Sequence, residues 1–103
     1  MANDLVKEYE RVDDLQNGFM LIQNPEYFCF GLDAVLLASF ARVKKGERVL
    51  DMCTGTGVVP ILLQEKTPGD AFVGLEIQEA CAEMASRSVR YNHLEDRVQI
   101  VQG

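Results

Sequence analysis

The sequence is poor in the residue types that build metal centres and disulfide frameworks. It holds one histidine and three cysteines in 103 residues. The cysteines, Cys29, Cys53 and Cys81, lie far apart and form no Cys-x-x-Cys pair. An odd number of widely spaced cysteines argues against both a zinc site and a disulfide framework. We therefore expect reduced thiols and no bound metal.

Long apolar runs and an excess of cations are also missing. No stretch approaches the roughly 18 apolar residues that span a bilayer. The first ten residues carry Asp4, Glu8 and Glu10, which is unlike a signal or transit peptide. We therefore expect a cytoplasmic protein that makes no membrane contact. The net charge of −6 disfavours non-specific binding to nucleic acid.

The remaining composition is that of a folded domain, with 48% hydrophobic and 25% charged residues. We expect one folded unit that begins near residue 10. Its pattern divides into an N-terminal segment, residues 1–47, and a region of alternating strand and helix periods, residues 48–103.

The N-terminal segment predicts a hairpin followed by a helix. Residues 19–23 have the composition of a strand, 24–26 carry turn chemistry, and 27–30 provide a returning strand. Asp33 then stands where the N-cap of a helix over 33–42 belongs. Two lysines and a glycine at 44–46 suit the end of that helix.

The second region predicts an α/β sheet. Strands are expected at 48–52, 71–76 and 97–101, and helices at 58–66 and 78–92. Alternating elements with short loops imply parallel strands joined by right-handed crossovers. Two crossovers in the same direction place the strands in the spatial order third, second, first.

The helix over 78–92 has a clear amphipathic pattern. Its expected buried face is formed by Ile77, Cys81, Met84, Ala85 and Val89. Its expected solvent face is formed by Glu79, Glu83 and Arg87. Glu83 and Arg87 are spaced for an i, i+4 ion pair. We interpret the arginines at 87, 90 and 97 as a solvated face and not as an RNA-binding patch.

A glycine-rich turn follows the first of these strands and points to a ligand site. Asp51 ends the strand, and Gly55 and Gly57 lie in the turn before the next helix. Glycines let a backbone approach a ligand closely, and a helix start offers amide donors. Glu76 ends the next strand about 20 residues further on, where a doubly wound fold binds ribose hydroxyls. Pro60 replaces the third glycine of the dinucleotide motif, which makes an oxidoreductase the weaker alternative.

These motifs resemble those of class I S-adenosylmethionine-dependent methyltransferases. Residues 51–57, Asp-Met-Cys-Thr-Gly-Thr-Gly, are similar to the family's D-x-G-x-G-x-G motif, and residues 74–78 to its ribose-binding strand end. Residues 30–38 and 92–97 resemble segments of the bacterial tRNA(Val) adenine-N6 methyltransferase group. The resemblance implies a Rossmann-like fold, of which this chain would hold the N-terminal half.

The resemblance also implies S-adenosylmethionine as cofactor and a role for each site residue. The residues that would surround its methionine end are Asp51, Cys53, Thr54, Gly55, Thr56 and Gly57. Glu76 would hold the ribose, Ile77 would lie against the adenine, and Asp33 would cover the methionine side. Cys53 stands where the family has glycine. A positive φ there would strain the cysteine; otherwise its side chain would narrow the pocket.

The methyl acceptor implied by the resemblance is an adenine of tRNA. In the family, an acid after the third strand contacts the adenine of the cofactor, and an Asn-Pro-Pro-Tyr motif after the fourth holds the target amino group. The sequence reaches Gly103 before either, so we assign no catalytic residue and expect the chain alone to be inactive. The edge of the strand over 48–52 would then be open for self-association. A non-catalytic, cofactor-binding or self-associating fragment is the alternative.

Overall fold

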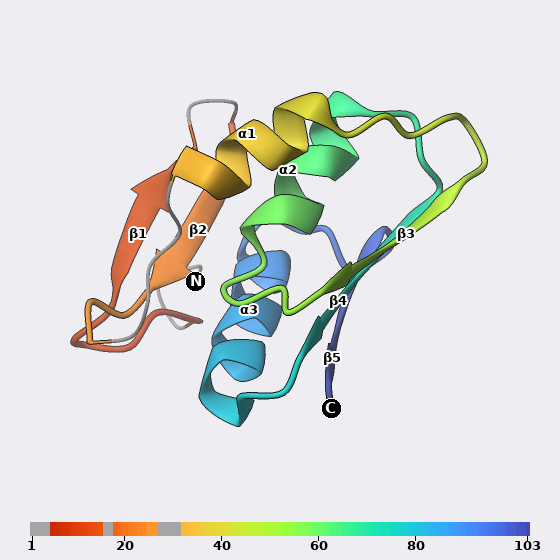
Figure 1. Cartoon of the computed structure of the whole chain (residues 1–103). Helices are drawn as coiled ribbons and strands as arrows, with labels where there is room; N and C mark the ends of the chain where they lie inside the picture. The colour runs from red at the N-terminus through yellow and green to blue at the C-terminus, as the bar shows by residue number, and fades with distance from the viewer. Residues whose placement is uncertain (1–4, 16–17, 27–31) are drawn as a thin grey trace.

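The computed structural model describes residues 5–15, 18–26 and 32–103, which form a small hairpin, a parallel sheet and three helices (Figure 1). The antiparallel hairpin consists of β1 (Arg11–Asp14) and β2 (Met20–Gln23). The parallel sheet consists of β3 (Arg48–Met52), β4 (Ala71–Glu76) and β5 (Val98–Gln102). The helices are α1 (Leu32–Phe40), α2 (Val58–Lys66) and α3 (Glu79–Tyr91).

The predicted sheet is confirmed in strand order and direction. The order is β3-β4-β5 and both pairs are parallel, with Leu50 opposite Val73 and Val73 opposite Gln99. β5 lies one residue later than predicted, because a turn ends at Arg97. The carboxyl ends of β3 and β4 therefore meet at one edge, with the chain leaving each toward a helix.

One face of the sheet carries the hydrophobic core, and all three helices lie on that side (Figure 1). Phe72 and Val98 point into this core and are joined there by Ile61 and Leu62 of α2 and Val89 of α3. Because β-strand side chains alternate, the next residues face the other way. Of these outward residues, Leu50 and Met52 are 59% and 68% exposed. Among the described residues no helix covers that outer face.

β2 has a partner in the described chain that the sequence analysis did not predict. β2 pairs with β1, with Arg11 opposite Gln23, and residues 27–30 lie outside the described part of the chain. Residues 11–14 read Arg-Val-Asp-Asp, and charged residues of this kind give no strand signal. Charged residues are tolerated in β1 because it is an exposed edge strand. The contact with the core is made by its partner β2, through the buried Leu21 and Ile22. The turn at 24–26 is present, and Glu26 N–H donates to Asn24 Oδ1 at 2.9 Å.

The bounds of α1 also correct the prediction. The helix begins at Leu32, so Asp33 lies in its first turn and is not its N-cap. It ends at Phe40, before the two lysines and the glycine. Those residues form the turn into β3 instead: Glu47 N–H donates to Lys44 O at 3.1 Å, and Gly46 has a φ of 87°. A glycine with positive φ suits both the end of a helix and a tight turn. Here Gly46 lies in the turn that precedes β3.

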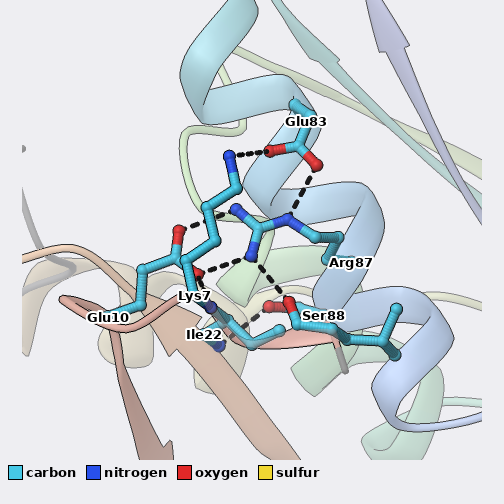
Figure 2. A network of polar contacts seen from close by, with 7 residues as sticks. Lys7, Glu10, Ile22, Glu83, Arg87 and Ser88 are labelled. Atoms are coloured by element: carbon cyan, nitrogen blue, oxygen red, sulfur yellow. Dashed lines mark hydrogen bonds and ion pairs between the residues drawn. The ribbon is translucent and has the colours of Figure 1, made fainter. Parts of the chain in front are cut away.

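Arg87 is buried, against the prediction that it faces solvent (Figure 2). Its guanidinium donates to the two carboxylate oxygens of Glu10 at 2.5 and 2.7 Å and to Leu5 O at 2.7 Å. The predicted pair with Glu83 is present at 2.7 Å. The side chains of Arg87 and Glu10 are only 7% and 3% exposed. The folded unit therefore includes residues before position 10.

Two further predictions about exposed and buried positions were wrong. Ile77 precedes α3 and is 74% exposed, so it takes no part in the helix's buried face. Arg97 is only partly exposed and is engaged by the protein. Its guanidinium lies 5.5 Å from the centre of the Phe72 ring and donates to Gln64 O and Gly69 O at 2.9 and 2.7 Å. Both Arg87 and Arg97 are therefore committed to internal contacts.

The hairpin is fixed to α3 by hydrogen bonds as well as by apolar packing. Ile22 N–H donates to the fully buried Ser88 Oγ at 2.8 Å, and Met20 N–H donates to Asn92 Oδ1 at 2.7 Å. The apolar core likewise includes residues of both predicted regions, such as Leu21 and Phe72. The division of the chain at residue 47 stays a prediction.

We predict that Glu10→Ala lowers the free energy of unfolding by about 3 kcal/mol, because it leaves Arg87 buried without its main counter-ion. Glu83→Ala is the control: the Glu83 side chain is 47% exposed, and such pairs contribute about 0–1 kcal/mol. Urea denaturation followed by circular dichroism measures both. Equal losses for the two variants would contradict the assignment.

The same contact gives stability a defined pH dependence. Arg87 lowers the pKa of Glu10 below its ordinary value of 4.5, against the opposing effect of burial. A lowered folded pKa contributes stability that is present above the unfolded value and is lost as the pH falls through the folded value. We expect the free energy of unfolding to fall with acidification below about pH 4.5, and this part of the slope to be absent in Glu10→Ala. An unchanged slope in the variant would assign the acid sensitivity elsewhere.

Candidate functional site

The turn between β3 and α2 has an unusual backbone. Cys53, Gly55 and Gly57 have φ values of 61°, 59° and 85°. Glycine adopts this region freely, whereas a cysteine held there costs about 1–3 kcal/mol. Of the two alternatives for Cys53, the structure therefore shows the strained backbone. Its side chain is exposed and lies on the rim of the hollow described below.

Glu76 connects this turn to the end of the neighbouring strand. Its Oε1 accepts the N–H of Gly55 at 2.9 Å, and its Oε2 accepts the N–H of Gln78 at 3.0 Å. Glu76 is 7% exposed. A carboxylate can accept about four hydrogen bonds, so these two leave acceptor capacity for a ligand. Glu76 thus supports the turn in addition to any ligand it binds.

Asp51 is the last residue of β3 whose side chain faces the helices, because Met52, which ends the strand, faces the other way. Its Oδ2 accepts a hydrogen bond from Thr54 Oγ1 at 2.7 Å. Partial burial raises the pKa of Asp51, and the bond from Thr54 opposes that rise. A carboxylate in this position, at the mouth of a turn and partly removed from water, suits a cationic ligand group.

A hollow of about 290 Å³ opens between this turn and α1. Six of the predicted residues line it: Asp33, Asp51, Cys53, Thr54, Gly55 and Thr56. Ala34, Leu37 and Val58 supply apolar lining that the sequence analysis did not assign. The volume is close to the lower end of small-molecule sites, about 300 Å³.

The other three predicted residues lie outside this hollow. Gly57 is buried under α3, where an added Cβ would lie 3.2 Å from Ala85 Cβ. Glu76 lies behind the turn, one hydrogen bond from Gly55. Ile77 projects from the carboxyl edge next to β4. Six of the nine residues therefore surround one hollow, while Glu76 and Ile77 lie at the end of the neighbouring strand β4.

Gly74 is a residue of the site that the sequence analysis did not single out. A Cβ built at this position would lie 2.7 Å from Thr54 Oγ1 and 2.8 Å from Thr54 Cγ2. Such distances are too short for a side chain, so the turn sits on β4 only because position 74 is glycine. A glycine within a strand is a signal for close approach, and this signal was available in the sequence.

Within the described ranges, no group of three or more His, Cys, Asp or Glu side chains is placed to hold a metal ion. Of the described helices, none combines the length and the apolar character needed to cross a bilayer.

Comparison with known sequences identifies relatives over most of the chain, although no protein-family model matches it. The tRNA1(Val) (adenine(37)-N6)-methyltransferase of Bacteroides thetaiotaomicron is 42% identical over 72 residues. That match covers 69% of this chain and 30% of the relative. The predicted resemblance to this methyltransferase group is thus confirmed, and the chain spans about a third of the length of the relatives it matches.

Solved structures confirm the fold. Trm5 of Methanocaldococcus jannaschii, in complex with adenosine, matches 94% of this chain and 30% of its own with a TM-score of 0.74 at 18% identity. The tRNA (uracil-54, C5)-methyltransferase of Pyrococcus abyssi, in complex with S-adenosyl-L-homocysteine, matches 93% of this chain and 24% of its own, with a TM-score of 0.71 at 24% identity. The chain therefore has the Rossmann-like fold of these methyltransferases, in the part that the match covers.

Proposed function

We propose that this chain binds S-adenosylmethionine and forms the cofactor-binding part of a methyltransferase. The observation that carries the proposal is the hollow beside the glycine-rich turn, with the carboxylates of Asp51 and Glu76 at the carboxyl ends of two adjacent strands. Parallel α/β sheets bind their ligands at this edge. The named activity of the relative and the S-adenosyl-L-homocysteine and adenosine in the two structural neighbours agree with that cofactor.

The proposed roles follow from the position of each group. Asp51, half-buried beside the hollow, would take the ammonium group of the methionine moiety. Glu76, at the end of the next strand, would accept hydrogen bonds from the ribose hydroxyls. The exposed Ile77 next to it offers an apolar surface to the adenine. Asp33 of α1 would close the methionine side of the hollow.

The methyl acceptor that we propose for the complete protein is an adenine of tRNA, modified at N6. The support is the name of the 42% identical relative. Arg87 and Arg97 add nothing to it, because both are engaged in contacts within the protein, and the net charge of −6 does not favour RNA. We assign no catalytic residue to these 103 residues. A tRNA substrate would place the protein in the cytoplasm.

An oxidoreductase that binds a nicotinamide dinucleotide is the alternative considered from the sequence. Pro60 stands at the third glycine of the dinucleotide motif and is buried in the first turn of α2. That glycine normally allows close packing of the helix on the strand, which a proline ring does not permit. The methyltransferase proposal is therefore the stronger one.

We predict that Glu76→Gln weakens binding of S-adenosyl-L-homocysteine by about 1.5–3 kcal/mol, the contribution of hydrogen bonds to a charged group. Glutamine keeps an acceptor for Gly55 N–H, so the turn retains that bond, while the acceptor for Gln78 N–H is lost. Glu79→Gln, an exposed acid at the start of α3, is the matched control. Isothermal titration calorimetry compares the three proteins. Equal affinity of Glu76→Gln and wild type would remove Glu76 from the site, and no binding by any of the three would contradict the proposed function.

We also propose that copies of the chain associate at β3. In the described structure β3 pairs only with β4, so its other edge is open. Beside this edge lies the uncovered outer face, with the exposed Leu50 and Met52. By strand alternation that face contains Arg48 and no carboxylate, so the charge of −6 does not oppose contact between two such faces. Open apolar edges of this kind recruit a second chain.

Size-exclusion chromatography with light scattering tests this association over a range of protein concentrations. We expect wild type to show a concentration-dependent mass above that of the monomer and Leu50→Lys to remain monomeric, because lysine is costly to bury at an interface. Leu36→Lys changes an exposed leucine of α1, away from β3, and should behave as wild type. A wild-type chain that is monomeric at every concentration would overturn the proposal.

A further inference from the structure

We propose that Thr54 and Gly74 act together as positioning residues that aim the Asp51 carboxylate into the hollow. This inference rests on the proposed function, because it concerns how the same site holds a cationic ligand group. Thr54 would act through Asp51, and Gly74 would act by leaving space for Thr54. Neither role follows from the glycine-rich motif itself, which ends at Gly57.

Thr54 is held on three sides. Its N–H donates to Leu75 O at 2.9 Å, and its carbonyl accepts the N–H of Gly57 at 3.0 Å. Its hydroxyl donates to Asp51 Oδ2 at 2.7 Å, and the residue is 5% exposed. A side chain fixed in this way has one orientation, so the hydroxyl proton is directed at a single carboxylate oxygen. Among the described contacts none involves Asp51 Oδ1, which leaves that oxygen for a ligand.

Gly74 makes this arrangement possible. In the β3–β4 register Gly74 is directly opposite Asp51, so a side chain there would stand beside the carboxylate. The Thr54 side chain occupies that space instead, within 2.7 to 2.9 Å of the position that a Cβ would take. Even alanine would push Thr54 away from β4, and with it the hydroxyl from Asp51. The missing side chain at position 74 therefore determines where the Asp51 carboxylate points.

The charges around Asp51 explain why its orientation matters. The other titratable groups that line the hollow are Asp33 from α1 and Cys53 from the turn, and Glu76 stands behind Gly55 at the end of β4. No basic side chain lines the described hollow. A ligand ammonium would therefore be the cation that meets Asp51, and a carboxylate held in advance loses less entropy when it binds.

The experiment removes the hydroxyl and leaves the volume in place. Calorimetry with S-adenosyl-L-homocysteine compares wild type, Thr54→Val and Thr54→Ser over a pH series. We expect Thr54→Val to bind roughly tenfold more weakly, as the loss of a hydrogen bond to a charged group implies, and Thr54→Ser to stay within about threefold of wild type. Thr67→Val is the matched control, because it removes a hydroxyl that bonds Leu63 O at the far end of α2.

The pH series provides a readout that a general loss of structure would not produce. Ligand binding by wild type should fall as Asp51 is protonated, since its pKa is raised by burial and held down by Thr54. Without the hydroxyl that pKa rises further, so the midpoint in Thr54→Val should move to higher pH. Carbon NMR of the Asp51 carboxyl group follows the same shift in the free protein, without any ligand.

The outcomes separate this inference from the proposed function. If wild type fails to bind while the Asp51 carboxyl titration still shifts in Thr54→Val, the proposed function is wrong and the positioning contact stands. If Thr54→Val matches wild type in affinity and in pH midpoint, the inference is overturned. Gly74→Ala serves as a second variant in case Thr54→Val does not fold. It should weaken binding and raise the Asp51 pKa in the same direction, and wild-type behaviour would also overturn the inference.

Discussion

Two right-handed crossovers in the same direction are the constraint on which the rest of the structure depends. Because β3 to β4 and β4 to β5 move across the sheet the same way, α2 and α3 must lie on the same face. The inner row of side chains, with Phe72 and Val98, is then buried, and the outer row, with Leu50 and Met52, is left uncovered. The same connectivity brings the ends of β3 and β4 together with the starts of both helices. Core, exposed face and candidate site are three consequences of one topology.

Polar contacts, in addition to apolar packing, hold the N-terminal segment against α3. Arg87 of α3 collects two acids and a backbone carbonyl from parts of the chain far apart in sequence. A buried guanidinium offers several donors in a fixed plane, and it can therefore specify the position of an irregular segment that has no strand or helix to pair. Removing one partner leaves a buried charge without compensation. Arrangements of the segment that break the contact are therefore strongly disfavoured. Leu21 and Ile22 add buried apolar surface to the contact. The hydrogen bonds to Ser88 and Asn92 fix the position of β2 along α3.

Features that depend on neighbouring residues in the sequence were predicted well, and features that depend on contacts between distant segments were not. The strands and helices after residue 47 have strong periodic patterns, and they were predicted to within one or two residues. The sequence places Arg87 in solvent, because an arginine near glutamates on a helix usually faces water. In the structure Glu10, from the N-terminal segment, pairs with Arg87 in a buried position. β1 was missed for the same reason, since its residues have no strand preference of their own. Asp33 was misread as a cap because a helix can begin one residue earlier without any change in its apolar pattern.

The candidate site shows the same division between local pattern and tertiary contact. The glycine turn and the acids at 51 and 76 are visible in the sequence, yet the sequence does not say that Glu76 supports Gly55 or that Thr54 holds Asp51. In the structure each acid is bonded to the turn that it flanks. Both acids are therefore tied to a turn that includes the strained backbone at Cys53. This coupling lets a short loop maintain two carboxylates in fixed positions on neighbouring strands, which a ligand with separate cationic and hydroxyl groups requires.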